Sequence, residues 1–184
     1  MKASVYSPPR KSRRLEVIRK TVAPLGALQS PSVVEVGAGT ECHVTPPEVA
    51  ARMVDYLELS PDLSVLEPSA GTGNIIDALK GHKNITAVEL NYSLCKILRN
   101  RINPIQQCFL EYAAEPRSFD RVIMNPPFKK IKAHINAALN CLAPGGLLIA
   151  LVPITYDGGE VIETLSNDTF AHARVNTKIV RIYN

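Results

Sequence analysis

The sequence lacks the features of a metal-stabilised, a disulfide-linked or a membrane-spanning protein. None of its four cysteines forms a CxxC pair with another, so we expect reduced thiols rather than a zinc knuckle or a disulfide framework. The longest apolar run, Gly146 to Pro153, is far shorter than the ~20 residues that a membrane helix requires, and the N-terminus is polar and basic rather than signal-like. We therefore expect a soluble, cytoplasmic protein. The cysteines are Cys42, Cys95, Cys108 and Cys141.

Histidines with ligand spacing are also lacking. His43, His82, His134 and His172 are scattered along the chain, and we interpret them as surface or loop residues. The sequence predicts no metal site.

Positive charge is concentrated at the N-terminus. The first 20 residues carry seven lysines and arginines against one glutamate, a net charge of +6, which leaves −2 for the rest of a chain whose formal net charge is +4. Such an arm is suited to contact a phosphate backbone, although a solvated N-terminus would have the same composition. The candidate nucleic-acid contacts in the arm are Arg10, Lys11, Arg13 and Arg14.

Strand-like and helix-like segments alternate after the arm, which favours one doubly wound α/β domain with a mostly parallel sheet. We predict a basic arm and linker over residues 1–44 and a single domain over residues 45–184. The first helix is predicted to be capped by Thr45, with Pro46 at its first position and Glu48 completing a capping box. The other predicted helices lie near 74–79, 93–101 and 133–142. The predicted strands are 64–67, 85–90, 105–110, 121–125 and 147–153, with 175–183 added as an edge strand.

Two glycine turns compete as a nucleotide-binding loop. VVEVGAGT, residues 33–40, and VLEPSAGTGNI, residues 65–75, both place glycines after a strand, where the backbone can approach a ligand closely. Only the second turn opens directly into a helix, and the strand after it ends in Glu89, close to the ~20-residue distance at which a carboxylate meets ribose hydroxyls. We select residues 65–75, although both turns remain compatible with ordinary connections.

The segment Asn125-Pro126-Pro127-Phe128 stands at the C-terminal end of the predicted strand 121–125, where open α/β sheets place their chemistry. Together with TPPEVAARMV, VLEPSAGTGNI and TAVELN, it resembles the class I S-adenosylmethionine-dependent methyltransferases of the N6-adenine type, in their gamma arrangement. The resemblance runs from about Thr45 to Pro153. It implies a Rossmann-like methyltransferase sheet, mostly parallel with an antiparallel edge strand.

The resemblance also assigns a catalytic segment. The adenine N6 amine is a weak nucleophile, so a catalyst should hold both of its N–H groups with acceptors, here the Asn125 side-chain carbonyl and the Pro126 backbone carbonyl. Pro126 and Pro127 would fix the loop, and Phe128 would stack on an extruded base. Because the leaving group is a neutral thioether, the reaction requires neither a metal nor a strong general base.

The cofactor implied by the resemblance is S-adenosylmethionine. Thr45 and Pro46 would contact its methionine end, Glu67 its ammonium group and Glu89 its ribose. Where the family often has Asp before the corresponding Phe, this chain has Cys108, so adenine recognition would fall to backbone groups or Glu111. The remaining implied contacts are the backbone of Ala70, Gly71 and Gly73, and Phe109 beside the adenine ring.

The substrate is predicted to be nucleic acid, with DNA favoured over RNA. Lys129 and Lys130 would meet phosphates beside a flipped base, or would form a solvated helical turn. Only Ile154 to Ala173 separates the last predicted parallel strand from the final strand, too little for a target-recognition domain. Specificity would then be low, or would come from the arm, an oligomer or a partner. An RNA adenine or guanine methyltransferase, a non-catalytic scaffold and a protein glutamine methyltransferase remain alternatives.

Overall fold

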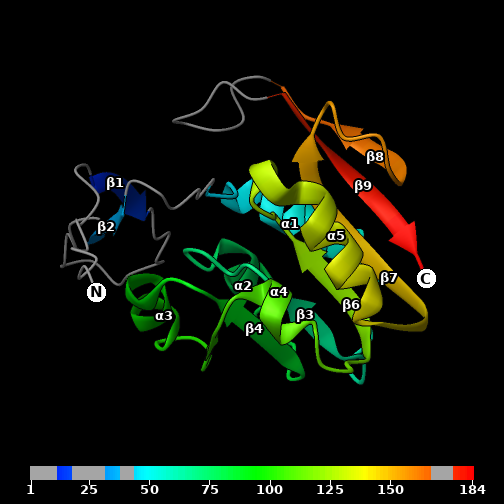
Figure 1. Ribbon diagram of the computed structural model, residues 1–184, viewed down its shortest axis with the longest axis horizontal. Helices are drawn as coiled ribbons and strands as arrows, with labels where there is room; N and C mark the ends of the chain where they lie inside the picture. The colour runs from blue at the N-terminus through cyan, green and yellow to red at the C-terminus, as the bar shows by residue number, and fades with distance from the viewer. Residues whose placement is uncertain (1–11, 18–31, 38–43, 167–175) are drawn as a thin grey trace, which may run out of the picture. The chain divides into compact units, whose positions relative to one another are not determined.

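The computed structural model describes residues 12–17, 32–37, 44–166 and 176–184 (Figure 1). The chain divides into two compact units, Met1–Glu41 and Cys42–Asn184. In the first unit, strand β1 (Ser12–Val17) pairs antiparallel with β2 (Ser32–Gly37), and Arg14 lies opposite Glu35 in the register. The strand predicted before Gly37 therefore pairs with a strand inside the basic arm that the sequence did not predict.

The second unit contains a seven-stranded sheet with the order β5-β4-β3-β6-β7-β9-β8. The strands from β3 to β7 pair in parallel, and β9 runs antiparallel to both β7 and β8, which confirms the predicted mostly parallel α/β sheet. The strands are β3 (Val65–Glu67), β4 (Ile85–Glu89), β5 (Ile105–Gln106), β6 (Phe119–Met124), β7 (Leu142–Pro153), β8 (Glu160–Thr164) and β9 (Thr177–Tyr183).

Helices cover both faces of this sheet because successive strand residues point to opposite sides. On one face, buried residues of α1 and α2 pack with Ile123 and Ile149; on the other, residues of α4 and α5 pack with Val122 and Leu148. Figure 1 shows α5 lying along β6 and β7. The helices are α1 (Pro47–Asp55), α2 (Asn74–Ala78), α3 (Tyr92–Leu98), α4 (Phe109–Tyr112) and α5 (Ile131–Asn140), with a 3-10 turn η1 (Phe128–Lys130). No helix among the residues described is both long and apolar enough to cross a bilayer.

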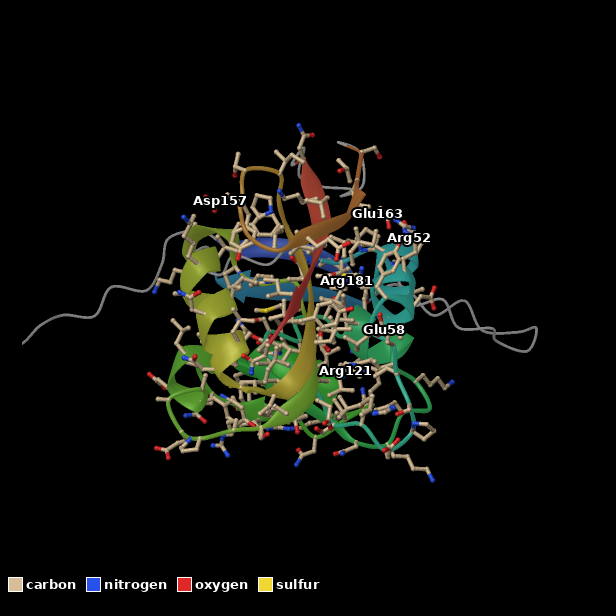
Figure 2. The ribbon with its side chains drawn as sticks, turned by 90° about the vertical axis from the view of Figure 1, so that its right-hand side faces the viewer. Arg52, Glu58, Arg121, Asp157, Glu163 and Arg181 are labelled. Atoms are coloured by element: carbon tan, nitrogen blue, oxygen red, sulfur yellow. The ribbon has the colours of Figure 1, made fainter. Side chains whose placement is uncertain are left out.

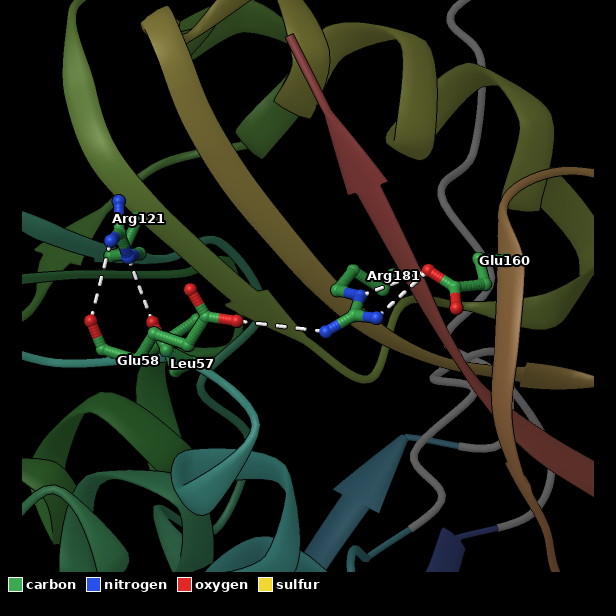
Figure 3. A network of polar contacts seen from close by, with 5 residues as sticks. All are labelled: Leu57, Glu58, Arg121, Glu160 and Arg181. Carbon is green, nitrogen blue, oxygen red and sulfur yellow. Dashed lines mark hydrogen bonds and ion pairs between the residues drawn. The ribbon is translucent and has the colours of Figure 1, made fainter.

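Polar contacts join α1 and the segment after it to strands β8 and β6 of the sheet. On β8, the Glu163 carboxylate accepts from Arg52 Nε at 3.1 Å and from the Tyr56 hydroxyl at 3.1 Å (Figure 2). Arg121 Nε donates to the Leu57 carbonyl at 2.7 Å (Figure 3). These contacts fix the position of α1 on the sheet. Helix α1 begins two residues after Thr45, a predicted cofactor contact.

Arg181 of β9 continues the same network. Its guanidinium lies between two carboxylates, 2.9 Å from Glu160 and 3.6 Å from Glu58, and so links β9 to β8 and to the segment after α1 (Figure 3).

Three predictions about individual elements are wrong. The 175–183 strand is not the edge: β9 lies between β7 and β8, and the unpredicted β8 forms the edge. The strand predicted over 105–110 ends at Gln106, and Phe109 begins α4, because Phe109 and Tyr112, three residues apart, bury their rings together on one face of the sheet. Helix α1 begins at Pro47 with Pro46 as N-cap and no side-chain cap, so Thr45 does not cap it.

Candidate functional site

The candidate site lies at the carboxyl ends of three neighbouring parallel strands. Glu67 ends β3, Glu89 ends β4, and Asn125 directly follows β6. Because β4, β3 and β6 are adjacent and parallel, their carboxyl ends meet at one edge of the sheet, the usual binding edge of an open α/β domain. The fold therefore brings together three residues that the sequence predicted for the same site.

Glu67 is a buried carboxylate with an unsatisfied oxygen. Its side chain is 2% exposed, and Oε2 has no hydrogen-bond partner among the described residues. Burial, and next the charge of Glu89, raise the pKa of Glu67 well above its ordinary value. Ionising a buried carboxyl group of this kind is costly unless a cation or donor meets it, so the site fits a ligand that carries an ammonium group.

Glu89 is held by backbone amides on both of its oxygens. Oε1 accepts from Asn91 N at 2.7 Å, and Oε2 accepts from Gly71 N at 2.8 Å. Burial raises the pKa of Glu89, and these backbone bonds oppose that rise. Since each carboxylate oxygen has a second lone pair, the group can still accept from a ligand diol. Glu89 thus joins the glycine turn to the end of β4 in a fixed orientation.

The glycine turn before α2 depends on two residues with positive φ, Gly71 at +54° and Gly73 at +86°. A Cβ at Gly73 would lie 2.7 Å from Leu98 Cδ2, and its positive φ is one that other residues adopt only with strain. Gly73 N donates to the Ala70 carbonyl at 2.8 Å, and Ala70 N donates to Val88 at 3.0 Å. The amides of Ala70, Gly71 and Gly73 all donate to acceptors within the protein. The turn would therefore contact a ligand through the close approach of its backbone rather than through these N–H groups.

Thr45 connects the segment after β6 to the start of α2. Its hydroxyl accepts from Asn125 Nδ2 at 2.9 Å, and its carbonyl accepts from Asn74 Nδ2 at 2.7 Å. Thr45 is 6% exposed, so both bonds are sheltered from water. Sequence reasoning missed Asn74; the amide side chain directly after the Gly73 turn was the available signal.

The segment after β6 leads through two prolines into the turn η1. Asn125 is half-buried, Pro126 is buried, and Pro127 at φ −57° caps the turn η1, in which Phe128 is half-buried. Lys129 and Lys130 follow on the exposed side of this turn. The segment therefore places an amide, an aromatic ring and two cations in succession at the binding edge.

The structure buries Phe109, which the resemblance placed beside the cofactor adenine. Its side chain is 4% exposed, and its ring centroid lies 6.0 Å from that of His134. At the end of β4 the exposed apolar side chain is instead Leu90, 66% exposed and next to Glu89. Sequence reasoning missed Leu90, although an apolar residue directly after the strand-ending acid was visible in TAVELN.

The other predicted residues belong to the first unit, to the start of α1 or to the part of the chain that the structure does not describe. Arg13 and Arg14 belong to β1 of the first unit, and Arg10 and Lys11 fall outside the described residues. Pro46 is half-buried at the start of α1.

The interpretation of the histidines is wrong for His134, which is 8% exposed with Nδ1 3.1 Å from the Lys130 carbonyl. It packs in the first turn of α5, where a ring that covers Phe109 is shielded from water. His43 and His172 lie outside the described residues. Within the described ranges, no three His, Cys, Asp or Glu side chains are grouped so that they could hold a metal ion.

No protein-family model and no curated protein matches the sequence. Solved structures do match its fold. The 23S rRNA methyltransferase ErmE is 21% identical, with a TM-score of 0.60 over 74% of this chain and 67% of that chain. The EcoKI Type I restriction enzyme M protein is 16% identical, with a TM-score of 0.63 over 80% of this chain and 45% of that chain.

An RNA methyltransferase from Salinibacter ruber, solved in complex with S-adenosyl-L-homocysteine, is 15% identical, with a TM-score of 0.58 over 76% of this chain and 92% of that chain. The chain thus spans two thirds of ErmE and less than half of the EcoKI M protein. Similarities at these low identities show a shared fold. The second unit has a Rossmann-like methyltransferase fold.

Proposed function

We propose that this protein is an S-adenosylmethionine-dependent N-methyltransferase that modifies an exocyclic amine in nucleic acid, with adenine N6 in DNA as the favoured substrate. The observation that carries the proposal is the hydrogen bond from Asn125 to Thr45 at the edge where Glu67 and Glu89 end their strands. It joins the segment that would hold the target amine to the segment that would hold the cofactor.

The cofactor half rests on Glu67. Its unsatisfied, buried Oε2 matches an ammonium group, and Glu89, fixed by Gly71 and Asn91, would accept from the ribose hydroxyls. When bound, S-adenosylmethionine supplies a methyl group activated by a sulfonium. Thr45 and Pro46 would lie at its methionine end. The complex of the Salinibacter ruber enzyme with S-adenosyl-L-homocysteine supports this choice of ligand.

The catalytic half rests on Asn125. With its Nδ2 donating to Thr45, the carbonyl oxygen at the opposite end of the amide is the acceptor that we assign to the target amine. The Pro126 carbonyl would accept from the second N–H, so that the nitrogen is drawn towards tetrahedral geometry. Phe128 would stack on the base, which contributes ~1–3 kcal/mol in comparable sites.

Nucleic acid is supported as the substrate by the cations that follow this segment. Lys129 and Lys130 are exposed next to Phe128, where they would meet phosphates beside an extruded base. The resemblance to N6-adenine enzymes is the reason for preferring DNA in this proposal, and RNA is the alternative substrate that the similarity to a 23S rRNA methyltransferase supports. Sequence specificity would come from the basic arm, an oligomer or a partner.

The test is transfer of tritiated methyl groups from S-adenosylmethionine to separate DNA, RNA and protein pools, followed by nucleoside digestion. We expect N6-methyladenine from the DNA pool. Label in RNA alone would replace DNA by RNA as the substrate, and label in protein alone, or in no pool, would contradict the proposal.

Asn125→Ala is the matched variant for this assay. The hydrogen bond to the Asn125 carbonyl should strengthen in the transition state, so its loss should raise the activation free energy by ~3 kcal/mol and lower kcat about a hundredfold. The cofactor Kd should be nearly unchanged. Asn140→Ala, an exposed residue at the end of α5, is the control and should keep the wild-type rate. A wild-type rate for Asn125→Ala would remove the catalytic assignment.

A further inference from the structure

Arg101 donates hydrogen bonds to the backbone of the glycine turn, although it lies 28 residues after Gly73 in the sequence. It follows α3 and is 20% exposed. Its Nη2 donates to the Thr72 carbonyl at 2.7 Å, and its Nη1 donates to the Gly73 carbonyl at 3.2 Å. Nη1 also lies 2.7 Å from Asp77 Oδ2 on α2. One guanidinium therefore holds two successive carbonyls and one carboxylate.

We propose that Arg101 is a positioning residue of the cofactor-binding turn, which fixes the peptide groups of Thr72 and Gly73 so that the turn presents one surface to the ligand. The inference rests on the proposed function. A peptide group is planar with its N–H opposite its C=O, so fixing a carbonyl also fixes the direction of the following amide. Gly71 and Gly73, at positive φ, would otherwise sample many conformations.

The packing around Gly73 supports this role. A Cβ at Gly73 would lie 2.7 Å from Arg101 Nη1 and 2.7 Å from Leu98 Cδ2, so the guanidinium and the end of α3 lie close against the Gly73 backbone. Arg101 also acts on the neighbouring carboxylate: its charge lowers the pKa of Glu67 against the larger effect of burial. The guanidinium thus favours the ionised form that an ammonium ligand requires.

The geometry requires arginine rather than any cation. A guanidinium is a rigid planar fork that can donate to two carbonyls and a carboxylate together, whereas a lysine ammonium is a point charge on a flexible chain. Arg101→Lys should therefore keep the charge near Glu67 and lose most of the positioning. Asp77→Asn removes only the charged partner that orients the fork, so its effect should be smaller.

The experiment is isothermal titration of each purified full-length variant with S-adenosyl-L-homocysteine, with the folded fraction measured by thermal unfolding. We expect Kd to rise about tenfold or more for Arg101→Met, about threefold to tenfold for Arg101→Lys and about twofold for Asp77→Asn, in keeping with the loss of charged hydrogen bonds. The matched control is Arg99→Met, an exposed arginine at the end of the same helix, which should bind like the wild type.

A lower melting temperature with a wild-type Kd in Arg101→Met would make Arg101 a structural residue and overturn the inference. If Arg101→Met does not fold, Arg101→Lys decides, because a wild-type Kd in that variant would show that the fork is not needed. Absence of binding by the wild-type protein would instead contradict the proposed function itself. Binding by the wild type that neither Arg101 variant changes would contradict only the positioning role.

Discussion

Replacing Glu67 by glutamine should stabilise the ligand-free protein and weaken its binding of cofactor. The substitution keeps the size of the side chain and removes an ionisable carboxyl group. Glu67 is 2% exposed, and its Oε2 has no hydrogen-bond partner among the described residues. In the ligand-free protein that charge is a cost, because burial and the neighbouring Glu89 both oppose ionisation. With the cofactor bound, the ionised Glu67 would pair with an ammonium group, so the substitution should raise the Kd for the cofactor.

The magnitude follows from the cost of an unsatisfied buried group, ~1–3 kcal/mol. Because the glutamine amide is polar as well and recovers only part of this cost, we expect a gain of ~1–2 kcal/mol, or about 2–8 °C in Tm for a chain of this size. The pKa of Glu67 is raised in the folded protein, so its contribution to stability is fully present below the ordinary value of 4.5 and is lost as pH rises through the folded pKa. The advantage of Glu67→Gln should therefore be small below pH 4.5 and should grow as the pH rises above it.

The assay is thermal unfolding of the ligand-free variants across this pH range, combined with titration of S-adenosyl-L-homocysteine, for which we expect at least about a tenfold rise in Kd. Glu163→Gln is the control, because that carboxylate is paired with Arg52 and Tyr56, and its loss should lower Tm rather than raise it. A lower Tm for Glu67→Gln at pH 8, or an unchanged Kd, would refute the reasoning.

Two further predictions concern hydrogen bonds seen in the structure. Thr45→Val removes the acceptor for Asn125 and should lower kcat about tenfold, whereas Thr45→Ser should keep most of the activity; equal rates for both variants would contradict the positioning of Asn125. Asp120 accepts from the Ser64 hydroxyl at 2.7 Å and from Ser64 N at 2.8 Å, and these bonds lower its pKa, so Asp120→Ala should cost ~1–2 kcal/mol at neutral pH. That cost is present above the ordinary pKa of 3.8 and should vanish as pH falls through the lower folded value, which acid unfolding of both proteins would check.

Strands β3 and β4 were predictable from their own residues. Val65–Glu67 and Ile85–Glu89 combine mostly apolar, largely buried residues with an acid at the point where the strand ends, so both the strand and the candidate site residue can be predicted from a short window of sequence. Asn125 was identifiable for the same reason, since it follows the buried end of β6.

The strand β8 was not predictable, because it depends on its neighbour β9. Its sequence, EVIET, is short and rich in acids, and it becomes a strand by pairing with β9, whose Ile179 and Val180 are fully buried. Charged residues on an edge strand are usual, because they discourage pairing with other chains. In the same way, Phe109 reads as part of an apolar strand until the packing of Tyr112 against α5 makes it helical.

Thr45 shows how a local rule was overridden by a distant contact. A capping box requires unsatisfied N–H groups at the start of the helix, but Pro46 and Pro47 have none, and Val49 N and Ala50 N donate to the Pro46 carbonyl at 3.0 and 2.9 Å. Because few donors remain to be capped, the Thr45 hydroxyl stabilises more by accepting from Asn125, 80 residues away in the chain. Because of the two prolines, the Thr45 side chain can contact Asn125 in the candidate site rather than cap the helix, as the local pattern predicts.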